Sequence, residues 1–250
     1  MSRCQSAVFL ALIFPLVSAS AQEGSVAKLA TVPFVGCLSD GQVGPLPAPT
    51  DAVKVQADSR VAPKLAYYKA ENGPGVLGPK GWHCFGTYGS SGAQLFVAPQ
   101  PIPQRSLFSS EGYRFTGPVI QADTISGGTS GRFGVARLIA RVFPTYRDFV
   151  RHVIDEGIRP ASDFPFGPYP TDRLEYKSDW MVEYRTPPHT EGLGTDSHLQ
   201  KNDDWIDGVV ILQGPETYLT KLTLRLPEDS NTLESAIRAQ FEKESDNPPR

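Results

Sequence analysis

Glycine and proline interrupt this chain throughout its 250 residues, and they constrain its fold more than any other sequence feature. The chain contains 23 glycines and 23 prolines, which are scattered along it rather than clustered. Proline cannot continue a helix or donate a hydrogen bond to a strand ladder, and glycine weakens both kinds of element. A helical bundle is therefore disfavoured, and the pattern predicts many short strands joined by turns.

The first half of the chain is predicted to form sheet. Short runs of strand-forming residues are separated there by glycine, proline and serine. The glycines of Gly89-Ser90-Ser91-Gly92 can adopt the positive φ that tight hairpin connections need, so a hairpin is expected at this point. We expect strands at residues 29–38, 64–69, 82–88, 94–98 and 118–122.

The spacing of apolar residues becomes helical in the middle of the chain. Between Phe133 and Val142 they recur at three- and four-residue intervals, and Ser130 is in position to cap the helix. Pro144 ends that helix, and a second one is predicted over residues 145–156, with a glycine directly after it. These two helices form the central pair of the predicted fold.

More strands and a last helix follow. Asn231 and Glu234 have the spacing of a capping box and predict the start of a C-terminal helix. The predicted fold class is α+β, mainly antiparallel sheet with a central helix pair and a C-terminal helix. The expected strands of this half are at 174–176, 180–185, 208–212 and 218–226.

Residues 1–21 have the order of a secretory signal peptide. A basic residue, Arg3, precedes an apolar run from Ala7 to Val17, and small residues follow this run. The run is shorter than the roughly 20 residues of a membrane-spanning helix, so we expect a cleaved signal and no membrane span. The mature protein is predicted to be soluble and periplasmic or secreted, with cleavage after Ala21.

The mature chain is expected to have two parts. Residues 22–58 are rich in small residues and proline and are predicted to be an extended segment. Residues 59–250 are predicted to form a single α+β domain. Two sub-lobes, 59–125 and 126–250, are the alternative within that domain.

Two cysteines remain once the signal peptide is removed. Cys4 lies inside the signal peptide, which leaves Cys37 and Cys84. Two thiols in an exported chain are most simply interpreted as one disulfide bond. A free or metal-bound pair of thiols is the alternative.

The charge balance limits the classes of partner. The chain has 24 lysines and arginines against 27 aspartates and glutamates, for a net charge of −3. Such a chain is not expected to attract nucleic acid or anionic lipid strongly. No cofactor is predicted, because the nucleotide-binding glycine patterns are not matched.

Two loops rich in glycine and serine are candidate binding sites. Residues 126–131 precede a helix N-terminus, where Ser130 and Arg132 are candidates for binding an anion. Ser90 and Ser91 of the predicted hairpin form the second candidate pair. Neither loop has the Gly-x-Ser-x-Gly spacing of a hydrolase elbow, and a simple helix cap and a simple hairpin turn are the alternatives.

One loop concentrates groups that bind metals. His189, Glu191, Asp196 and His198 lie within ten residues of one another. Imidazole and carboxylate groups bind zinc or a similar metal if the loop folds back on itself, and they also serve as general acids and bases. The spacing matches no closed zinc motif, so a solvated polar loop is the simpler alternative. Convergence of these four side chains within about 5 Å would favour a chemical role.

Together these features predict an exported binding protein without enzymatic activity. Its expected partner is a periplasmic protein or an envelope component. The expected contact surfaces are residues 187–204 and 89–92, because loops on a rigid sheet commonly carry recognition. The alternative is a hydrolase of an envelope polymer, with metal assistance from the loop 189–198, and a small-ligand carrier is a third interpretation.

Overall fold

The computed structural model describes residues 28–109, 112–214 and 217–246. The predicted signal peptide, its cleavage site and Cys4 lie outside these residues. The first half of the chain forms β1 (Leu29–Thr31), β2 (Phe34–Cys37), β3 (Ser39–Gly41), β4 (Gln56–Asp58), β5 (Leu65–Ala70), β6 (Gly75–Pro79), β7 (His83–Gly89), β8 (Gly92–Ala98), α1 (Gln104–Leu107) and β9 (Val119–Ser126). The second half forms α2 (Arg132–Val142), α3 (Arg147–Asp155), β10 (Arg173–Ser178), β11 (Met181–Thr186), β12 (Ile206–Gln213), β13 (Tyr218–Arg225) and α4 (Asn231–Ser245).

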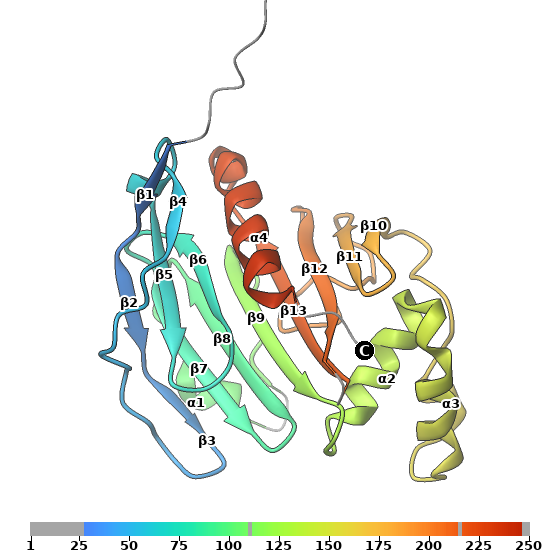
Figure 1. Cartoon of the computed structure of the whole chain (residues 1–250). Coiled ribbons are helices and arrows are strands. Elements are labelled where there is room, and N and C mark those ends of the chain that lie inside the picture. Colours follow the sequence, from blue (N-terminus) through green and yellow to red (C-terminus); the bar gives the residue numbers. More distant parts are fainter. Residues whose placement is uncertain (1–27, 110–111, 215–216, 247–250) are drawn as a thin grey trace, which may run out of the picture.

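An eight-stranded sheet forms the centre of the molecule (Figure 1). Its strand order is β10-β11-β12-β13-β9-β8-β7-β3. β9 pairs with β8 on one side and with β13 on the other, so strands from both halves of the chain share this sheet. The two predicted sub-lobes, 59–125 and 126–250, therefore share one central sheet.

One face of the central sheet is covered by α4 and by a three-stranded sheet, β2-β5-β6 (Figure 1). Apolar side chains of all these elements form one buried cluster. Leu95, Ile120 and Leu222 of the central sheet belong to it, together with Tyr68 of β5 and Phe241 of α4. Burial of apolar surface stabilises such a core by about 25 cal/mol per Å².

The opposite face of the central sheet packs against α2 and α3. Leu138, Ile139 and Val142 of α2 lie at the predicted helical spacing and are buried. They join a second apolar cluster with Val210 of β12 and Leu219 of β13. These helices cover only part of this face, and the part left open contains the cavity described below.

The fold is α+β, as predicted, with mixed sheets. β2 runs parallel to β5, and β3 runs parallel to β7. The alternation of apolar residues indicates that a segment is a strand, but it does not indicate the direction of the neighbouring strand. The parallel pairs were therefore not foreseen.

The N-terminal segment is part of the folded core from residue 28 onward. β1 pairs with β4, and Val55 and Ala57 are buried in the core cluster. Leu46 lies in the proline-rich stretch and forms an isolated bridge with Ser39. The expectation of a simple extended segment over 22–58 did not include these pairings within the segment, since no local motif indicates which extended stretches pair.

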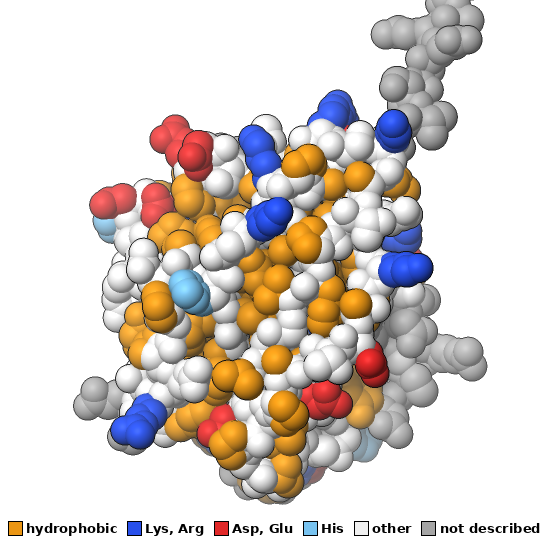
Figure 2. All heavy atoms as spheres, turned by 90° about the vertical axis from the view of Figure 1, so that its left-hand side faces the viewer, with side chains coloured by type: hydrophobic (Ala, Val, Ile, Leu, Met, Phe, Trp, Pro, Cys, Tyr) orange, Lys and Arg blue, Asp and Glu red, His pale blue; other side chains and the backbone are white. Residues whose placement is uncertain are grey.

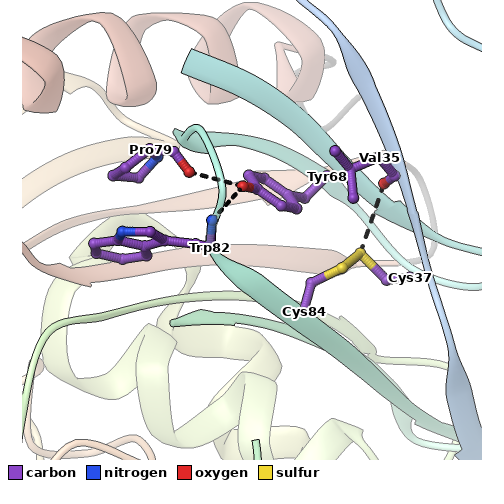
Figure 3. The surroundings of a disulfide bond; sticks show 6 residues. All are labelled: Val35, Cys37, Tyr68, Pro79, Trp82 and Cys84. Atoms are coloured by element: carbon purple, nitrogen blue, oxygen red, sulfur yellow. Dashed lines mark hydrogen bonds between the residues drawn. A yellow bond between two sulfur atoms is a disulfide. The ribbon is translucent and has the colours of Figure 1, made fainter. Parts of the chain in front are cut away.

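The predicted disulfide is formed between Cys37 and Cys84 (Figure 3). It links the end of β2 to β7, and so it ties the three-stranded sheet to the central sheet. Beside it, the Tyr68 hydroxyl donates to the carbonyl of Pro79 at 2.7 Å and accepts from the backbone N–H of Trp82 at 3.1 Å. This corner of the core is thus held by covalent, polar and apolar contacts.

The predicted helix signals had different outcomes. Gly157 follows α3 with a φ of 67°, as a glycine stop signal requires. Ser130, in contrast, does not cap α2, whose first residue follows Gly131 without a side-chain cap. The Ser130 hydroxyl instead forms a hydrogen bond of 2.8 Å with the hydroxyl of Ser91.

The outer surface near the N-terminal strands is apolar in places. Figure 2 shows hydrophobic side chains interspersed with neutral ones at the centre of this face, and charged groups mainly toward its border. In the part of the chain from residue 28 to 53, the large exposed apolar residues are Leu29, Leu38, Val43 and Val53. Within the residues that the structure describes, no helix has the length and apolar character needed to cross a membrane.

Candidate functional site

A cavity of about 900 Å³ opens on the face of the central sheet that carries α2. Strands β7, β8, β9 and β13 form its floor. Its walls come from α2, from the end of α1 and from residues 196–198 of the long loop between β11 and β12. The volume is at the upper end of the range for small-molecule pockets.

Polar side chains from three neighbouring strands form a row across the floor. In the strand ladders Gln94 lies opposite Asp123, and Asp123 lies opposite Lys221. Directly opposite side chains on antiparallel strands have Cβ atoms about 4.5–5.5 Å apart. Alternate residues of the same strands, such as Leu95 and Ala122, face the core on the other side of the sheet. One set of strands therefore supplies both a dry core and a polar cavity floor.

Asp123 is held by amide groups rather than by a cation. It is 5% exposed. The Nε2 of Gln94 donates to its Oδ1 at 3.0 Å, and the Nε2 of Gln121 donates to Oδ1 and Oδ2 at 2.8 and 3.0 Å. The partners of the two amide oxygens are Thr87, through its hydroxyl, and His198, through its backbone N–H. These donors fix both amides so that their NH₂ groups face the carboxylate.

Burial perturbs both charged groups of the floor. It raises the pKa of Asp123, and the Gln121 amide and the nearby Lys221 ammonium oppose this effect. Burial also lowers the pKa of Lys221. Lys221 is 2% exposed and donates to the carbonyls of Leu193 and Asp196, both at 2.7 Å. The ammonium thus fastens the loop that forms the cavity wall.

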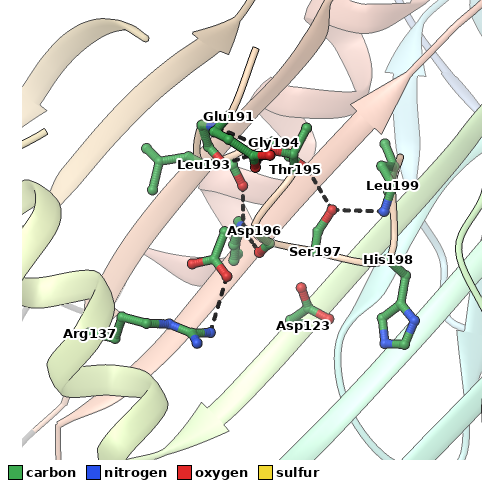
Figure 4. Close-up of polar contacts among 12 residues, drawn as sticks. Asp123, Arg137, Glu191, Leu193, Gly194, Thr195, Asp196, Ser197, His198 and Leu199 are labelled. Atoms are coloured by element: carbon green, nitrogen blue, oxygen red, sulfur yellow. Dashed lines mark hydrogen bonds and ion pairs between the residues drawn. The ribbon is translucent and has the colours of Figure 1, made fainter. Parts of the chain in front are cut away.

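The wall contains a second charged pair. Arg137 of α2 lies 3.2 Å from Oδ1 of Asp196 (Figure 4). The other carboxylate oxygen, Oδ2, is buried and has no hydrogen-bond partner among the described residues. Half of the Arg137 side chain is exposed. The pair therefore has an unused acceptor on Asp196 and unused donors on Arg137.

His198 lies at the same wall (Figure 4). Its Nδ1 is 2.8 Å from the carbonyl oxygen of Tyr113, which can only accept, so Nδ1 carries a hydrogen. The ring meets the ring of Phe96 edge-on, with centroids 5.1 Å apart. These contacts hold the imidazole in a defined orientation beside Asp123.

The predicted metal-binding loop does not gather its four groups. His189 pairs with Asp203 at 2.9 Å, and Glu191 pairs with Lys201 at 2.5 Å, both at the surface. Asp196 and His198 border the cavity but have the separate partners described above. Within the described parts of the chain, no three histidine, cysteine, aspartate or glutamate side chains lie together as metal ligands do. The loop is thus divided between an outer polar surface and the cavity wall.

Of the two predicted binding sites in the glycine- and serine-rich loops, only the hairpin pair lies at the cavity. Ser90 and Ser91 border the cavity. The Arg132 guanidinium is occupied by the Glu156 carboxylate, to which it donates at 2.7–3.0 Å, and so it is not free to bind an anion in this arrangement. Ser130 contacts Ser91 and links the hairpin to the start of α2.

No sequence motif identified the most buried members of the site. Asp123 and Lys221 lie on two strands nearly one hundred residues apart, and only the pairing register brings them together. A signal was present in β13, where Lys221, Thr223 and Arg225 alternate with apolar residues. A central strand with one polar face indicates a polar interior or a cavity.

Comparison with protein-family models, with curated proteins and with solved structures gave no match.

Proposed function

We propose that this chain is an exported binding protein that holds a small polar ligand, or a segment of an envelope component, in the cavity. The observation that carries the proposal is the placement of Asp123 and Lys221 under an open cavity. Burying charged groups costs free energy, and ionisable groups with perturbed pKa values in a cleft are candidates for a functional role. The preformed cavity supports binding of a ligand larger than a single ion.

Export is part of the proposal. The Cys37–Cys84 disulfide supports it, because disulfides persist in oxidising compartments such as the periplasm. We propose removal of residues 1–21, with Gln22 as the first residue of the mature protein. N-terminal sequencing of protein purified after export in a bacterial host tests this, and an N-terminus at Met1 would contradict it.

The binding proposal is tested with a variant that fills the cavity. Gly89 borders the cavity, and a Cβ atom there meets no atom within 4 Å. It lies two residues beyond Thr87 in β7, so its side chain would point to the cavity face of the sheet. We expect Gly89→Trp to fold and to abolish binding of fragments that the wild type binds.

The matched control is Gly128→Trp. A Cβ at Gly128 also meets no atom within 4 Å, and this residue does not border the cavity. Fragment binding is measured by ligand-observed NMR with a library of mixed chemical classes. Hits that survive in Gly128→Trp but not in Gly89→Trp support the cavity as the binding site. A library without any such hit refutes the proposed function.

Hydrolysis of an envelope polymer is the second candidate. It is favoured by the different environments of two carboxylates at the cavity, since burial raises the pKa of Asp123 while Asp196 pairs with Arg137. Such a difference suits one general acid and one ionised partner. Incubation with peptidoglycan fragments, followed by mass spectrometry, tests it, and products that persist in Asp123→Asn would contradict this assignment.

A further inference from the structure

The floor of the cavity presents one unused acceptor beside one unused donor. A carboxylate has about four lone-pair sites, and Asp123 already accepts three hydrogen bonds from two amide nitrogens, two of them at Oδ1. Oδ2 therefore has room for one more donor. Lys221 has three N–H groups and gives two of them to backbone carbonyls. Its third N–H has no hydrogen-bond acceptor among the described residues, although the ammonium lies 5.8 Å from the centroid of the Tyr184 ring.

This combination selects against ligand groups that carry a single sign of charge. An ammonium group of a ligand would pair with Asp123, but Lys221, which lies opposite Asp123 in the strand ladder, would repel it. A carboxylate or phosphate would suit Lys221 and would be repelled by Asp123. A hydroxyl group both donates and accepts, and so it satisfies both side chains without bringing a charge.

The wall repeats the arrangement. The Oδ2 atom of Asp196 is a buried acceptor without a partner among the described residues, which a ligand reaches when the carboxylate turns, and the half-exposed Arg137 has unused donors beside it. The cavity borders as a whole are balanced, with three aspartates, Asp40, Asp123 and Asp196, and three cationic residues, Arg114, Arg137 and Lys221. A ligand therefore need not neutralise any charge of the protein.

The mouth of the cavity adds apolar surface. Phe108 borders the cavity and is 51% exposed. Its ring can cover the aliphatic C–H face of a ligand whose edges carry hydroxyl groups, as aromatic side chains do in mostly apolar binding sites. Polar edges and an apolar face are combined in carbohydrates.

We infer that the cavity binds a neutral polyhydroxylated ligand of the carbohydrate class, through Asp123 with Lys221 and Asp196 with Arg137. This inference rests on the proposed function, because it requires that the cavity binds a ligand at all. The volume of about 900 Å³ leaves room for more than one sugar unit.

The test compares three oligosaccharide trimers that differ in charge. The probes are the trimers of N-acetylglucosamine, which is neutral, of glucosamine, which is cationic, and of galacturonic acid, which is anionic. Titration calorimetry measures their affinity for the mature protein at about 50 and about 300 mM NaCl. We expect the neutral trimer to bind most tightly, with less than about a twofold change between the two salt concentrations.

Variants connect the affinity to the named groups. Asp123→Asn turns the unused acceptor into a donor, and Arg137→Gln removes the half-exposed guanidinium that pairs with Asp196. Each is expected to weaken binding of the neutral trimer by about tenfold or more, because a hydroxyl then meets an unmatched partner. Lys201→Met is the control. Lys201 lies on the same β11–β12 loop as Asp196, but it pairs with Glu191 and does not border the cavity. If Asp123→Asn does not fold, Arg137→Gln decides alone.

The outcomes separate the two proposals. A cavity that binds fragments but prefers the glucosamine or galacturonic acid trimer, or none of the three, overturns the carbohydrate inference and leaves the binding function standing. A cavity without any fragment hits that Gly89→Trp removes overturns both. Unchanged affinity in Asp123→Asn and Arg137→Gln places the saccharide elsewhere and also overturns the inference.

Discussion

The Nε atom of Arg238 lies 3.4 Å from Oε1 of Glu183, and this contact joins α4 to β11. The same arginine also lies 3.1 Å from Glu234 and 3.8 Å from Glu242, and Lys177 lies 3.2 Å from Glu183. Three carboxylates thus meet one arginine and one lysine at the edge of α4. Burial and the nearby Glu183 raise the pKa of Glu242 to about 7.

This cluster predicts that the protein loses stability as the pH rises through neutrality. Folded Glu242 holds its proton up to about pH 7, whereas the unfolded chain releases it near the ordinary value of 4.5. The folded state therefore binds more protons in between, and the free energy of unfolding falls with rising pH there. We expect a loss of about 1–2 kcal/mol between about pH 5 and about pH 8, measured by urea denaturation. Glu242→Gln should reduce this slope; part of it remains because burial also raises the pKa of Asp207 to about 6. An equal slope in the variant would contradict the assignment.

The disulfide predicts a large effect of thiol substitution. Cys37 and Cys84 are 47 residues apart, and linking them removes conformational entropy from the unfolded chain. Replacing both by serine is expected to lower the free energy of unfolding by about 2–4 kcal/mol. Guanidinium denaturation of the oxidised wild type and the double variant measures this difference. Titration of the denatured, unreduced protein should find no free thiol, and two free thiols would disprove the bond.

Loss of the buried cation Arg225 is expected to lower the free energy of unfolding strongly. Arg225 is 1% exposed, and its guanidinium donates to the carbonyl of Thr116 at 3.2 Å and to that of Gln200. Arg225→Met would remove the guanidinium donors from the Gln200 carbonyl and from the Thr116 carbonyl, which keeps the Asn202 amide as a donor at 2.9 Å, at an expected loss of about 2 kcal/mol or more. Arg151→Met is the control, because the Arg151 side chain is 66% exposed and its one ion pair among the described residues is with Asp148 on the same helix. Thermal unfolding compares the two variants, and equal melting temperatures would refute the structural role of Arg225.

The backbone at Gly92, the first residue of β8, leaves no space for a side chain. Its φ is 143°, and a Cβ atom there would lie 1.9 Å from the backbone oxygen of Thr124. Gly92→Ala is therefore expected to destabilise the protein by about 2 kcal/mol or more. Gly128→Ala, where a Cβ meets no atom within 4 Å, should change the free energy of unfolding by less than about 0.5 kcal/mol. A similar denaturation midpoint for both variants would show that the hairpin can shift to accept the methyl group.

Local chemistry explains which elements the sequence could predict. The β7–β8 hairpin depends on glycine at its turn, and α2 depends on helical spacing of apolar residues, so both follow from short segments. β6 was missed because Gly75, Gly78 and Pro79 are typical of turns. Its strand conformation comes from pairing with β5, and from Gln240 of α4, which accepts a hydrogen bond from the Leu77 N–H at 3.4 Å.

The residues of the candidate site also fall into a part that the sequence could predict and a part that it could not. Ser90, Ser91, Asp196 and His198 lie on loops whose polar composition made them candidates, and all four border the cavity. Asp123 could not be found this way, because its role depends on amides from β8 and β9 and on the register with β13. Pairing register is a property of distant segments, and no short motif encodes it.

The alternation of side chains along β9 places the residues that stabilise the core and the residues that line the cavity on opposite faces of one strand. Ile120 and Ala122 face the core, while Gln121 and Asp123 face the cavity. Under the proposed binding function, changes at Gln121 and Asp123 would alter the choice of ligand while the packing that stabilises the fold stays intact. Descendants of this chain could thus exchange one ligand for another by a few substitutions in a conserved architecture, and a designer could follow the same route.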